Sequence, residues 1–350
     1  MTIIRSELKS VRAVPHGSTH KKDLLDFSSS VIPLELPLLE LMHETEFFRY
    51  PDSESQELRN SISQHSDVHA SNVICGNGAS ELLWLVGMAC ISSNTKVGTL
   101  APTFGEYARI TAIMGGQLCY FPLQEHLDFK LDERELSTWI RNKNIQVFFL
   151  CNPNNPTGRY VSIEHVELLF VENPECLFVF DAAYIDYTNS AIPLKNWVEK
   201  FNVIVIYSLT KAFGIAGIRS GYALANEAYI EALNKVKPAW NLNALAQTAS
   251  KHLFDKRNKY SDVAKEYRDQ TIQMMATLST MRFRIIPSDT DYFMMGVNNP
   301  KKFKNNLLEK GFLIRELESM GVPNYVRINV CDRETNSRFI ETISKLFNTF

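Results

Sequence analysis

The stretch that decides the fold is Tyr207-Ser208-Leu209-Thr210-Lys211-Ala212-Phe213-Gly214-Ile215-Ala216-Gly217-Ile218-Arg219-Ser220-Gly221-Tyr222, which directly follows the β-branched run Val203-Ile204-Val205-Ile206. Such a run predicts a buried strand. Ser208, Lys211 and Arg219 bring a hydroxyl, an amine and a guanidinium to one tight turn. This set suits a phosphate held by serine and arginine beside an aldehyde that the lysine captures as a Schiff base. The alternative is a plain strand-to-strand loop with two incidental cations, and the rest of the chain decides between the two.

The composition is that of an ordinary globular protein: 350 residues, 45% of them hydrophobic and 22% charged, with a net charge of −2. A chain of this length can bury a large core, and we expect two domains. The small net charge gives no electrostatic reason to expect nucleic acid or a membrane as a partner. Six cysteines are scattered without Cys-x-x-Cys pairs or metal-ligand spacing. We therefore expect no metal site and free thiols in a reducing compartment, the cytoplasm.

Turn-forming residues dominate the first 45 residues, so this segment is expected to be an arm that lies across a domain surface or a neighbouring subunit. From Val73 onward apolar strand-like runs alternate with helical patterns, which predicts a mainly parallel sheet covered on both faces. Tyr50-Pro51-Asp52 is predicted to open a helix that continues to residue 65. Near the C-terminus Phe312-Leu313-Ile314-Arg315 is predicted to form one short strand. Ligands of such sheets bind at the carboxyl ends of the strands.

Two polar clusters at strand ends are weak signals by themselves. Gly76-Asn77-Gly78-Ala79-Ser80-Glu81 lies between a predicted strand and a helix, where small residues let the backbone approach an anion. Glycine-rich turns that bind nothing are equally common. Phe104, in Ala101-Pro102-Thr103-Phe104-Gly105-Glu106-Tyr107, follows the next strand. Its ring either lies flat against a heteroaromatic ligand or packs into the core.

Two further clusters are more specific. In Cys151-Asn152-Pro153-Asn154-Asn155-Pro156-Thr157-Gly158, two X-Pro bonds follow a buried strand, each a candidate for the cis form, and they predict a rigid loop from which Asn155 points an amide donor. Phe180-Asp181-Ala182-Ala183-Tyr184 ends an apolar strand with a carboxylate. A buried Asp181 requires a cationic or proton-bearing partner, and a protonated pyridine nitrogen meets that requirement.

In their order and approximate spacing these five stretches resemble the fold-type I pyridoxal-phosphate enzymes of the class I/II aminotransferase group. Within that group the chain is similar to histidinol-phosphate aminotransferases and threonine-phosphate decarboxylases, from about residue 16 to residue 350. The resemblance implies pyridoxal 5'-phosphate as the cofactor, an α/β fold with a mainly parallel seven-stranded sheet, and a cytoplasmic homodimer with shared active sites. It also implies an arm (1–45) that contributes to the small domain and the active site, a large cofactor-binding domain (46–240) and a small α/β domain (241–350).

The resemblance also implies a role for individual residues. Lys211 matches the Schiff-base lysine and Asp181 the partner of the pyridine nitrogen, and with Tyr184 they are the predicted catalytic residues. The remaining predicted cofactor contacts are Gly78, Ala79, Ser80, Phe104, Asn155, Ser208, Arg219 and Tyr50, of which the tyrosine reaches a phosphate across the dimer interface. The predicted substrate contacts are Arg327, which matches the arginine that binds the α-carboxylate, with Arg315, His16 and Asn155.

The arm departs from the pattern of these relatives. Pro15-His16-Gly17 resembles the opening of the threonine-phosphate decarboxylases, but Ser18 stands where a second glycine is expected. The segment that lines the substrate pocket in the relatives is replaced by Ser28-Ser29-Ser30-Val31-Ile32-Pro33-Leu34-Glu35. Arg315 matches an arginine that grips substrate phosphate, but Glu316 follows it and offers a competing ion pair. The side chain of the substrate therefore stays open.

Three functions follow from this pattern. The first is transamination of an amino acid, in which a proton leaves Cα. The second is a lyase reaction, either elimination or cyclisation of a modified amino acid in specialised biosynthesis or decarboxylation. The third, a cofactor-binding regulator fused to a DNA-binding module, is disfavoured because the chain has no spare basic helix-turn-helix segment.

Overall fold

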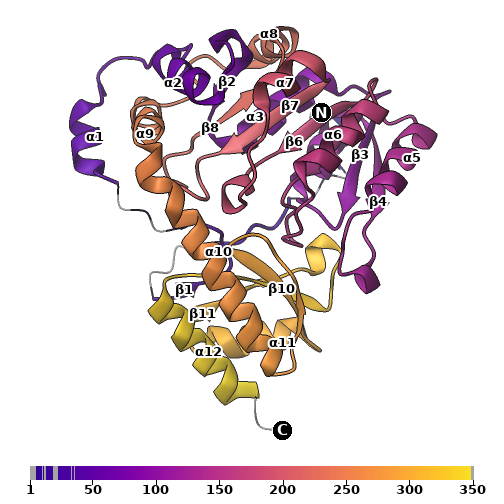
Figure 1. Cartoon of the computed structure of the whole chain (residues 1–350), viewed down its shortest axis with the longest axis vertical. Helices are drawn as coiled ribbons and strands as arrows, with labels where there is room; N and C mark the ends of the chain where they lie inside the picture. Colours follow the sequence, from indigo (N-terminus) through magenta and orange to yellow (C-terminus); the bar gives the residue numbers. More distant parts are fainter. Residues whose placement is uncertain are drawn as a thin grey trace, which may run out of the picture.

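The computed structural model describes residues 5–9, 11, 13–18, 23–32, 34 and 36–347. Its wide upper part is built around a seven-stranded sheet (Figure 1). Strand β8 is antiparallel to both of its neighbours, and every other pair of neighbouring strands is parallel. In spatial order the strands are β2 (Val73–Gly76), β8 (Gly221–Leu224), β7 (Val203–Ser208), β6 (Leu177–Asp181), β5 (Val147–Cys151), β3 (Lys96–Ala101) and β4 (Gln117–Pro122). The expected α/β fold with a mainly parallel seven-stranded sheet is confirmed.

The central strands are apolar because both faces of the sheet are covered. All residues of β5, β6 and β7 are buried, as expected for strands sandwiched between helices. Helix α3 packs against β7 and β8 and against α4 and α8, while α5 packs against α6. The helices of this part are α1 (Leu38–Glu44), α2 (Gln56–Ser66), α3 (Gly78–Cys90), α4 (Glu106–Met114), α5 (Glu133–Lys143), α6 (Ile163–Glu172), α7 (Leu194–Lys200), α8 (Glu227–Val236) and α9 (Ala244–Asp255).

The narrower lower part holds a four-stranded antiparallel sheet, and the long helix α10 (Arg257–Thr280) runs down into it from the upper part (Figure 1). In spatial order its strands are β12 (Arg315–Glu316), β13 (Tyr325–Asn329), β10 (Tyr292–Gly296) and β9 (Arg284–Ile286). Helices α11 (Pro300–Leu308) and α12 (Arg333–Phe347) pack against each other and complete this part. Helix α12 buries one face, on which Phe339 and Ile343 lie.

The arm crosses from one part to the other. Strand β1 (Leu25–Asp26) pairs in parallel with β11 (Phe312–Leu313), and Phe27 stacks on Phe339 with ring centroids 4.2 Å apart. Further on, the Ile32 N–H donates to the Lys211 carbonyl oxygen at 3.3 Å in the upper part. The arm is thus held against both sheets.

Two local predictions were wrong. Helix α2 begins at Gln56 and not near Tyr50, because the Asp52 carboxylate accepts the N–H groups of Glu54 at 3.0 Å and Gln56 at 2.7 Å and forms a turn before the helix. The stretch predicted as one strand is two, β11 and β12, with a break at Ile314. Strand β4 went unpredicted although it holds the apolar run Leu118-Cys119-Tyr120-Phe121; as the edge strand of the sheet it is only partly buried. Within the described residues, no helix is long and apolar enough to cross a membrane.

Candidate active site

Lys211 lies just beyond the end of β7, where the arm crosses the chain. Gly214 leaves room for this crossing, because a Cβ there would lie 2.1 Å from the Ile32 carbonyl oxygen. Burial first, and then the guanidinium groups of Arg327 and Arg219, lower the pKa of the Lys211 amine to about 8. An amine with this pKa is partly neutral near pH 7 and can act as a nucleophile or base.

Asp181 ends β6 with its side chain almost wholly buried, at 4% exposure. The Tyr107 hydroxyl donates to Oδ2 at 2.6 Å and the Ala183 N–H donates to Oδ1 at 3.0 Å. Burial raises the pKa of Asp181, and these two hydrogen bonds oppose that shift. Each carboxylate oxygen can accept a further hydrogen bond, so the group can receive a proton-bearing ring nitrogen.

Tyr107 is a site residue that the sequence did not reveal. It is fully buried, its ring stacks on Phe149 with centroids 5.0 Å apart, and it stands edge-on to Phe104 at 5.6 Å. Burial and the neighbouring Asp181 raise the pKa of Tyr107 well above its usual value, so the hydroxyl remains a donor. Phe104 precedes α4, which begins at Glu106, so no helical spacing in the sequence pointed to Tyr107.

The start of α3 and the turn before β8 form a small concave surface. Gly78 has a φ of +78°, and a Cβ on it would lie 2.5 Å from Nη2 of Arg219. A Cβ on Gly221 would lie 2.7 Å from the backbone nitrogen of Ala79. The two glycines therefore let a guanidinium and the free N–H groups of a helix start converge, which is how proteins bind phosphate. The nearby residues that line the central cavity are Ala79, Ser80, Ser208, Thr210 and Arg219.

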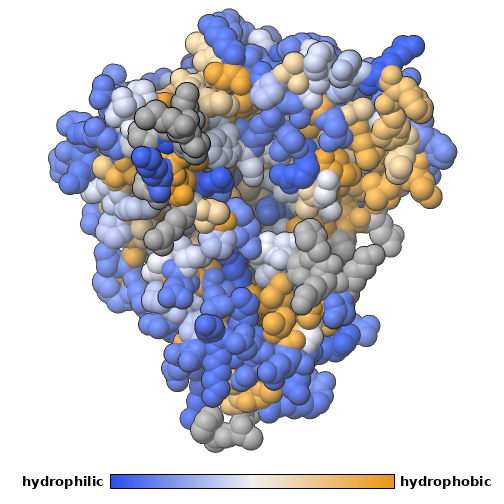
Figure 2. Space-filling model, turned by 180° about the vertical axis from the view of Figure 1, so that it is seen from behind, coloured by the Kyte–Doolittle hydropathy of each residue, from blue (hydrophilic) through white to orange (hydrophobic). Residues whose placement is uncertain are grey.

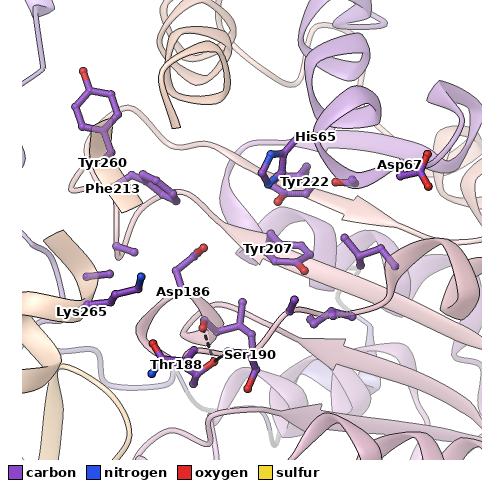
Figure 3. Close-up of a pocket in the computed structure, with 18 residues that line it drawn as sticks. His65, Asp67, Asp186, Thr188, Ser190, Tyr207, Phe213, Tyr222, Tyr260 and Lys265 are labelled. Atoms are coloured by element: carbon purple, nitrogen blue, oxygen red, sulfur yellow. Dashed lines mark hydrogen bonds between the residues drawn. The ribbon is translucent and has the colours of Figure 1, made fainter. Parts of the chain in front are cut away.

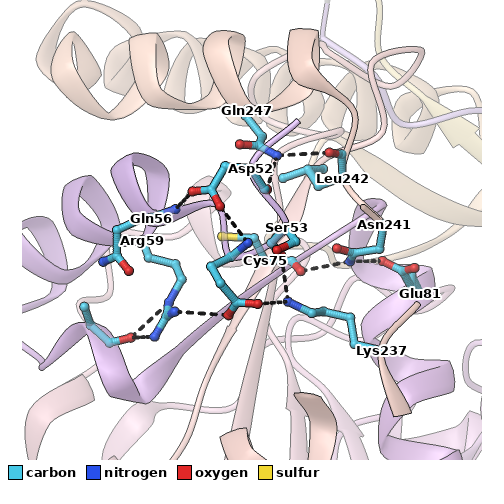
Figure 4. A network of polar contacts seen from close by, with 12 residues as sticks. Asp52, Ser53, Gln56, Arg59, Cys75, Glu81, Lys237, Asn241, Leu242 and Gln247 are labelled. Atoms are coloured by element: carbon cyan, nitrogen blue, oxygen red, sulfur yellow. Dashed lines mark hydrogen bonds and ion pairs between the residues drawn. The ribbon is translucent and has the colours of Figure 1, made fainter. Parts of the chain in front are cut away.

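A polar network behind this surface ties it to the turn at residues 51–55 (Figure 4). The Glu81 carboxylate accepts the N–H just before α3 at 2.6 Å and the side-chain amide of Asn241 at 2.7 Å. The side chains of Lys237 and Gln247 donate to carbonyl oxygens of the turn at 3.0 Å and 2.9 Å. The start of α3 is thus held by Glu81 and Asn241, while Lys237 and Gln247, on either side of Asn241 in the chain, hold the turn.

Arg327 lies in the middle of β13, is 3% exposed and joins two distant segments. Its Nη1 donates to Oδ1 of Asn155 at 2.8 Å and its Nη2 donates to the Ser28 carbonyl oxygen at 2.8 Å. Its Nε is buried and has no hydrogen-bond partner among the described residues, so a donor remains for a carboxylate. Because Arg327 occupies the Asn155 oxygen, the amide nitrogen of Asn155 is left to bind another acceptor. Both X-Pro bonds of that loop are cis.

Arg315 stands beside Arg327 in the register of β12 and β13. Its Nη2 donates to the Pro15 carbonyl oxygen at 2.7 Å. Burial first, and then Arg327, lower the pKa of Arg315 to about 10. The ion pair that the sequence offered does not form with Arg315, because Glu316 instead accepts from Lys304 at 2.9 Å.

Three ring-bearing side chains, those of His16, Phe104 and Tyr184, line the same cavity as Lys211. His16 Nε2 lies 3.3 Å from a carboxylate oxygen of Glu106, and the His16 ring is 6.0 Å from the ring of Phe104. The Lys211 amine lies 5.9 Å from the ring centroid of Tyr184. Burial raises the pKa of Tyr184, so its hydroxyl stays protonated.

Lys211, Asp181, Arg219, Arg327 and Arg315 all line one cavity of about 280 Å³, which Tyr107 does not line. Of the site residues predicted from the sequence, only Gly78 and Tyr50 do not line it. Gly78 lies directly behind Arg219. Tyr50 is 77% exposed and stacks on Trp240 with ring centroids 4.3 Å apart, away from the cavity. Within this chain Tyr50 therefore does not reach the other site residues.

A second, larger cavity of about 650 Å³ lies on the other face of β7 and β8 (Figure 3). Its floor includes Tyr207 and Tyr222, whose rings stack 4.8 Å apart. Because neighbouring side chains of a strand point to opposite faces, Tyr207 faces away from Ser208. None of the predicted site residues lines this second cavity.

Residues 27–343 match the family described as aminotransferase class I and II. The chain belongs to this family, whose enzymes use pyridoxal phosphate. It is 33% identical over 309 residues to the histidinol-phosphate aminotransferase of Christiangramia forsetii, covering 86% of each chain. It is 26% identical over 347 residues to that of Clostridium novyi, covering 97% of this chain and 96% of the relative.

Solved structures show the same fold. The histidinol-phosphate aminotransferase of Clostridium acetobutylicum superposes with a TM-score of 0.84 at 22% identity, covering 93% of this chain and all of that chain. The L-threonine-O-3-phosphate decarboxylase of Porphyromonas gingivalis superposes with a TM-score of 0.80 at 22% identity, covering 92% of this chain and 99% of that chain. The fold is thus shared by enzymes with different reactions.

The residues present fit pyridoxal phosphate. The two glycines keep open a cradle that a Cβ would fill, the buried Asp181 can accept a ring N–H, and the Lys211 amine of lowered pKa lines the same cavity as Asp181 and Arg219. This donor set offers partners for a phosphate, a pyridine nitrogen and an aldehyde in one cavity.

Proposed function

We propose that this chain transfers the amino group of an amino acid in the cavity around Lys211. One observation carries the proposal: the same cavity holds an amine of lowered pKa, the buried Asp181 carboxylate and the partly unbonded Arg327 guanidinium. Membership of the aminotransferase family supports it.

The proposed cofactor contacts rest on the resemblance to fold-type I enzymes and are supported by the cavity that most of these residues line. When bound, pyridoxal phosphate supplies an aldehyde that condenses with an amine and a ring that withdraws electrons from a breaking bond at Cα. The residues proposed to hold it are Arg219, Ser208, Gly78, Ala79 and Ser80 at its phosphate, Asp181 at its ring nitrogen, Asn155 and Tyr184 at its hydroxyl, and Phe104 at its ring face.

The chain's own residues then have separate tasks. The Lys211 amine would take the proton from Cα of the substrate and deliver it to C4′ of the bound cofactor, which its pKa of about 8 permits. Asp181 holds a proton on the ring nitrogen, because a buried carboxylate stabilises a facing cation. Arg327 binds the substrate carboxylate and orients Cα, and the arm shields the reaction from water.

The substrate is proposed to carry a second anionic group. Arg315 lines the cavity next to Arg327, and its guanidinium can donate to an anion at the substrate end of the cavity. The curated relatives cited above are histidinol-phosphate aminotransferases, and we place the phosphate or carboxylate of this chain's substrate at Arg315.

A lyase reaction is the second candidate. The wall of the cavity is formed by Ser28, Ser29 and Ser30 of the arm, the segment in which the sequence departs from its relatives. The decarboxylase with the same fold shows that this architecture serves a reaction other than amino transfer.

The deciding experiment is product analysis by mass spectrometry with a panel of amino acids and phosphorylated amino compounds. Transamination predicts a 2-oxo acid or other carbonyl product together with exchange of the Cα proton for solvent deuterium. Exchange without a carbonyl product contradicts transamination and supports elimination or cyclisation. Release of carbon dioxide without exchange supports decarboxylation. The Lys211→Ala protein is the control for turnover that does not depend on the enzyme.

We further propose a homodimer in which Tyr50 completes the partner's phosphate site. Apolar side chains gather over α1 and the segment that follows it, at the right side of Figure 2. Leu39 is 76% exposed and Phe48 is 98% exposed, and such a patch on a folded chain is typical of an interface. Sedimentation at assay concentration tests this, because a fully active monomer would contradict it. A Tyr50→Phe protein should bind the cofactor more weakly only if the dimer forms.

The division into an arm (1–45), a large domain (46–240) and a small domain (241–350) is proposed as well, together with a cytoplasmic location. Limited proteolysis followed by mass spectrometry tests the boundaries. Fractionation of cells that produce the protein tests the location.

A further inference from the structure

One buried carboxylate has no task in the proposed reaction. Asp291 lies just before β10 and is 1% exposed. The hydroxyl of Ser30 lies 2.7 Å from each of its two oxygens. A buried carboxylate is costly unless donors or cations compensate its charge. The donors and cations around Asp291 therefore indicate its role.

Asp291 grips the middle of an arm segment whose two ends are also held. At one end the Ser28 carbonyl oxygen accepts from Arg327 at 2.8 Å. At the other end the Ile32 N–H donates to the carbonyl oxygen of Lys211 at 3.3 Å. Residues 28–32 are thus held at three points. The partners at the two outer points are Arg327, to which we assign the substrate carboxylate, and Lys211, to which we assign the reacting amine.

The charges around Asp291 match this placement. Burial raises its pKa, while the Ser30 hydroxyl, Arg327 and Lys211 favour the ionised form. In return Asp291 raises the pKa of Lys211, against burial, Arg327 and Arg219. The other titratable groups in its field are neutral side chains whose pKa values rise with burial, namely Tyr184, Tyr187, Tyr267, Tyr292 and Cys331.

We propose that Asp291 is a positioning residue of the active site: through Ser30 it fixes residues 28–32 as the wall of the substrate cavity, and its negative charge faces both Arg327 and Lys211. This inference rests on the roles proposed above for Lys211 and Arg327. According to this inference, the conformation of the arm at Ser30 depends on Asp291, which is 261 positions away in the chain.

Two substitutions separate the charge from the hydrogen bond. Asp291→Asn keeps a side-chain oxygen that accepts from Ser30 but removes the charge. Ser30→Ala removes the hydrogen bond but leaves the charge. The matched control is Asp289→Asn. Asp289 is two residues from Asp291 in the chain, its carboxylate is partly exposed, and it lies 3.5 Å from Arg268.

The first measurement is the pH titration of the absorbance of the cofactor bound to Lys211 in the holoenzyme. Losing the negative charge of Asp291 destabilises the protonated form of the Lys211 nitrogen. Asp291→Asn should therefore lower the midpoint of this titration by about one pH unit, or about tenfold in the acid dissociation constant. Asp289→Asn should leave the midpoint in place, and Ser30→Ala should shift it less than Asp291→Asn does. An unchanged midpoint in Asp291→Asn, or an equal shift in Asp289→Asn, would overturn the role of the charge.

The second measurement is the split between KM and kcat, with hydrogen exchange of residues 28–32. Ser30→Ala should raise KM about fivefold with little change in kcat, equivalent to about 1 kcal/mol for one hydrogen bond, and should speed exchange in the arm. Unchanged KM and unchanged hydrogen exchange in Ser30→Ala would overturn the anchoring role of Asp291. This test does not need Asp291→Asn to fold.

Absence of any cofactor absorbance in the wild-type holoprotein would overturn the proposed function and this inference together. Normal wild-type absorbance with unaltered variants would overturn this inference alone.

Discussion

The two sides of the cavity are built in different ways. The side to which we assign the cofactor, called here the cofactor side, consists of the ends of β6 and β7 and the start of α3, where Asp181, Lys211 and the glycines lie. The side to which we assign the substrate, called the substrate side, is assembled from the arm, the loop of Asn155 and the strands of the lower sheet. Its contacts join residues far apart in the chain, such as Arg327 and Ser28, which are 299 positions apart.

This difference separates chemistry from selection of the substrate. The cofactor side belongs to the central strands β6 and β7, which are buried on both faces, so it changes only if the core changes. The substrate side forms only because the arm lies between the two sheets. Its residues can therefore be substituted while the core stays unchanged. Substitutions on the first side should therefore affect every substrate, and those on the second side should affect substrate binding while cofactor binding stays intact.

The largest effect is expected for Lys211→Ala. Removing the amine removes both the covalent attachment and the proton transfer at Cα, and general acid–base groups alone contribute about a hundredfold to ten-thousandfold. We expect kcat to fall by at least about a thousandfold for every substrate, and borohydride reduction should no longer label the chain at this position. A wild-type rate in the variant would contradict the assignment of the whole cofactor side.

Arg327→Lys should have the next largest effect, restricted to substrate use. A lysine cannot make the forked contact with a carboxylate, and a charge-assisted contact contributes about 1.5–3 kcal/mol. We expect kcat/KM to fall by about one to two powers of ten, with the dissociation constant of the cofactor unchanged. Loss of cofactor from this variant would show that the two sides are not separable.

Tyr107→Phe sharpens the picture of the cofactor side. The substitution keeps the ring that stacks on Phe149 but removes the hydroxyl that donates to Asp181. We expect cofactor affinity to weaken about tenfold, from the loss of one hydrogen bond to a charged group. The control is Tyr160→Phe, which removes a hydroxyl bonded to Ser190 outside the cavity and should leave the affinity unchanged. Equal affinities in both variants would exclude a role for Tyr107 in holding Asp181.

The smallest effect is expected from pH. The pKa of the Lys211 amine is lowered to about 8, so its neutral fraction rises as the pH rises towards 8 and levels off above 9. The rate of proton abstraction in single-turnover experiments should therefore increase about fivefold between pH 7 and pH 8. A rate that continued to rise about tenfold per unit beyond pH 9 would mean that burial and Arg327 do not shift the amine.

Most of the cofactor side could be predicted from the sequence because its motifs are local. Each lies within a few residues of the end of an apolar strand, and parallel strands bring their carboxyl ends to one edge. Tyr107 was missed because its bond to Asp181 joins residues 74 positions apart, and no spacing rule within one element reports such a contact. The roles of these residues stay predictions until the variants above are measured.

The sequence by itself determined the alternation of buried strands and helices, and with it the mainly parallel sheet and the place of Lys211 and Asp181 at its edge. Hydrophobic periodicity and turn residues act over a few positions, so the chain carries this information locally. Only the tertiary structure decided that β8 runs antiparallel and that Asp291 meets Ser30. Those features depend on which distant segments pack together, because a buried polar group takes whichever partner the packing brings to it.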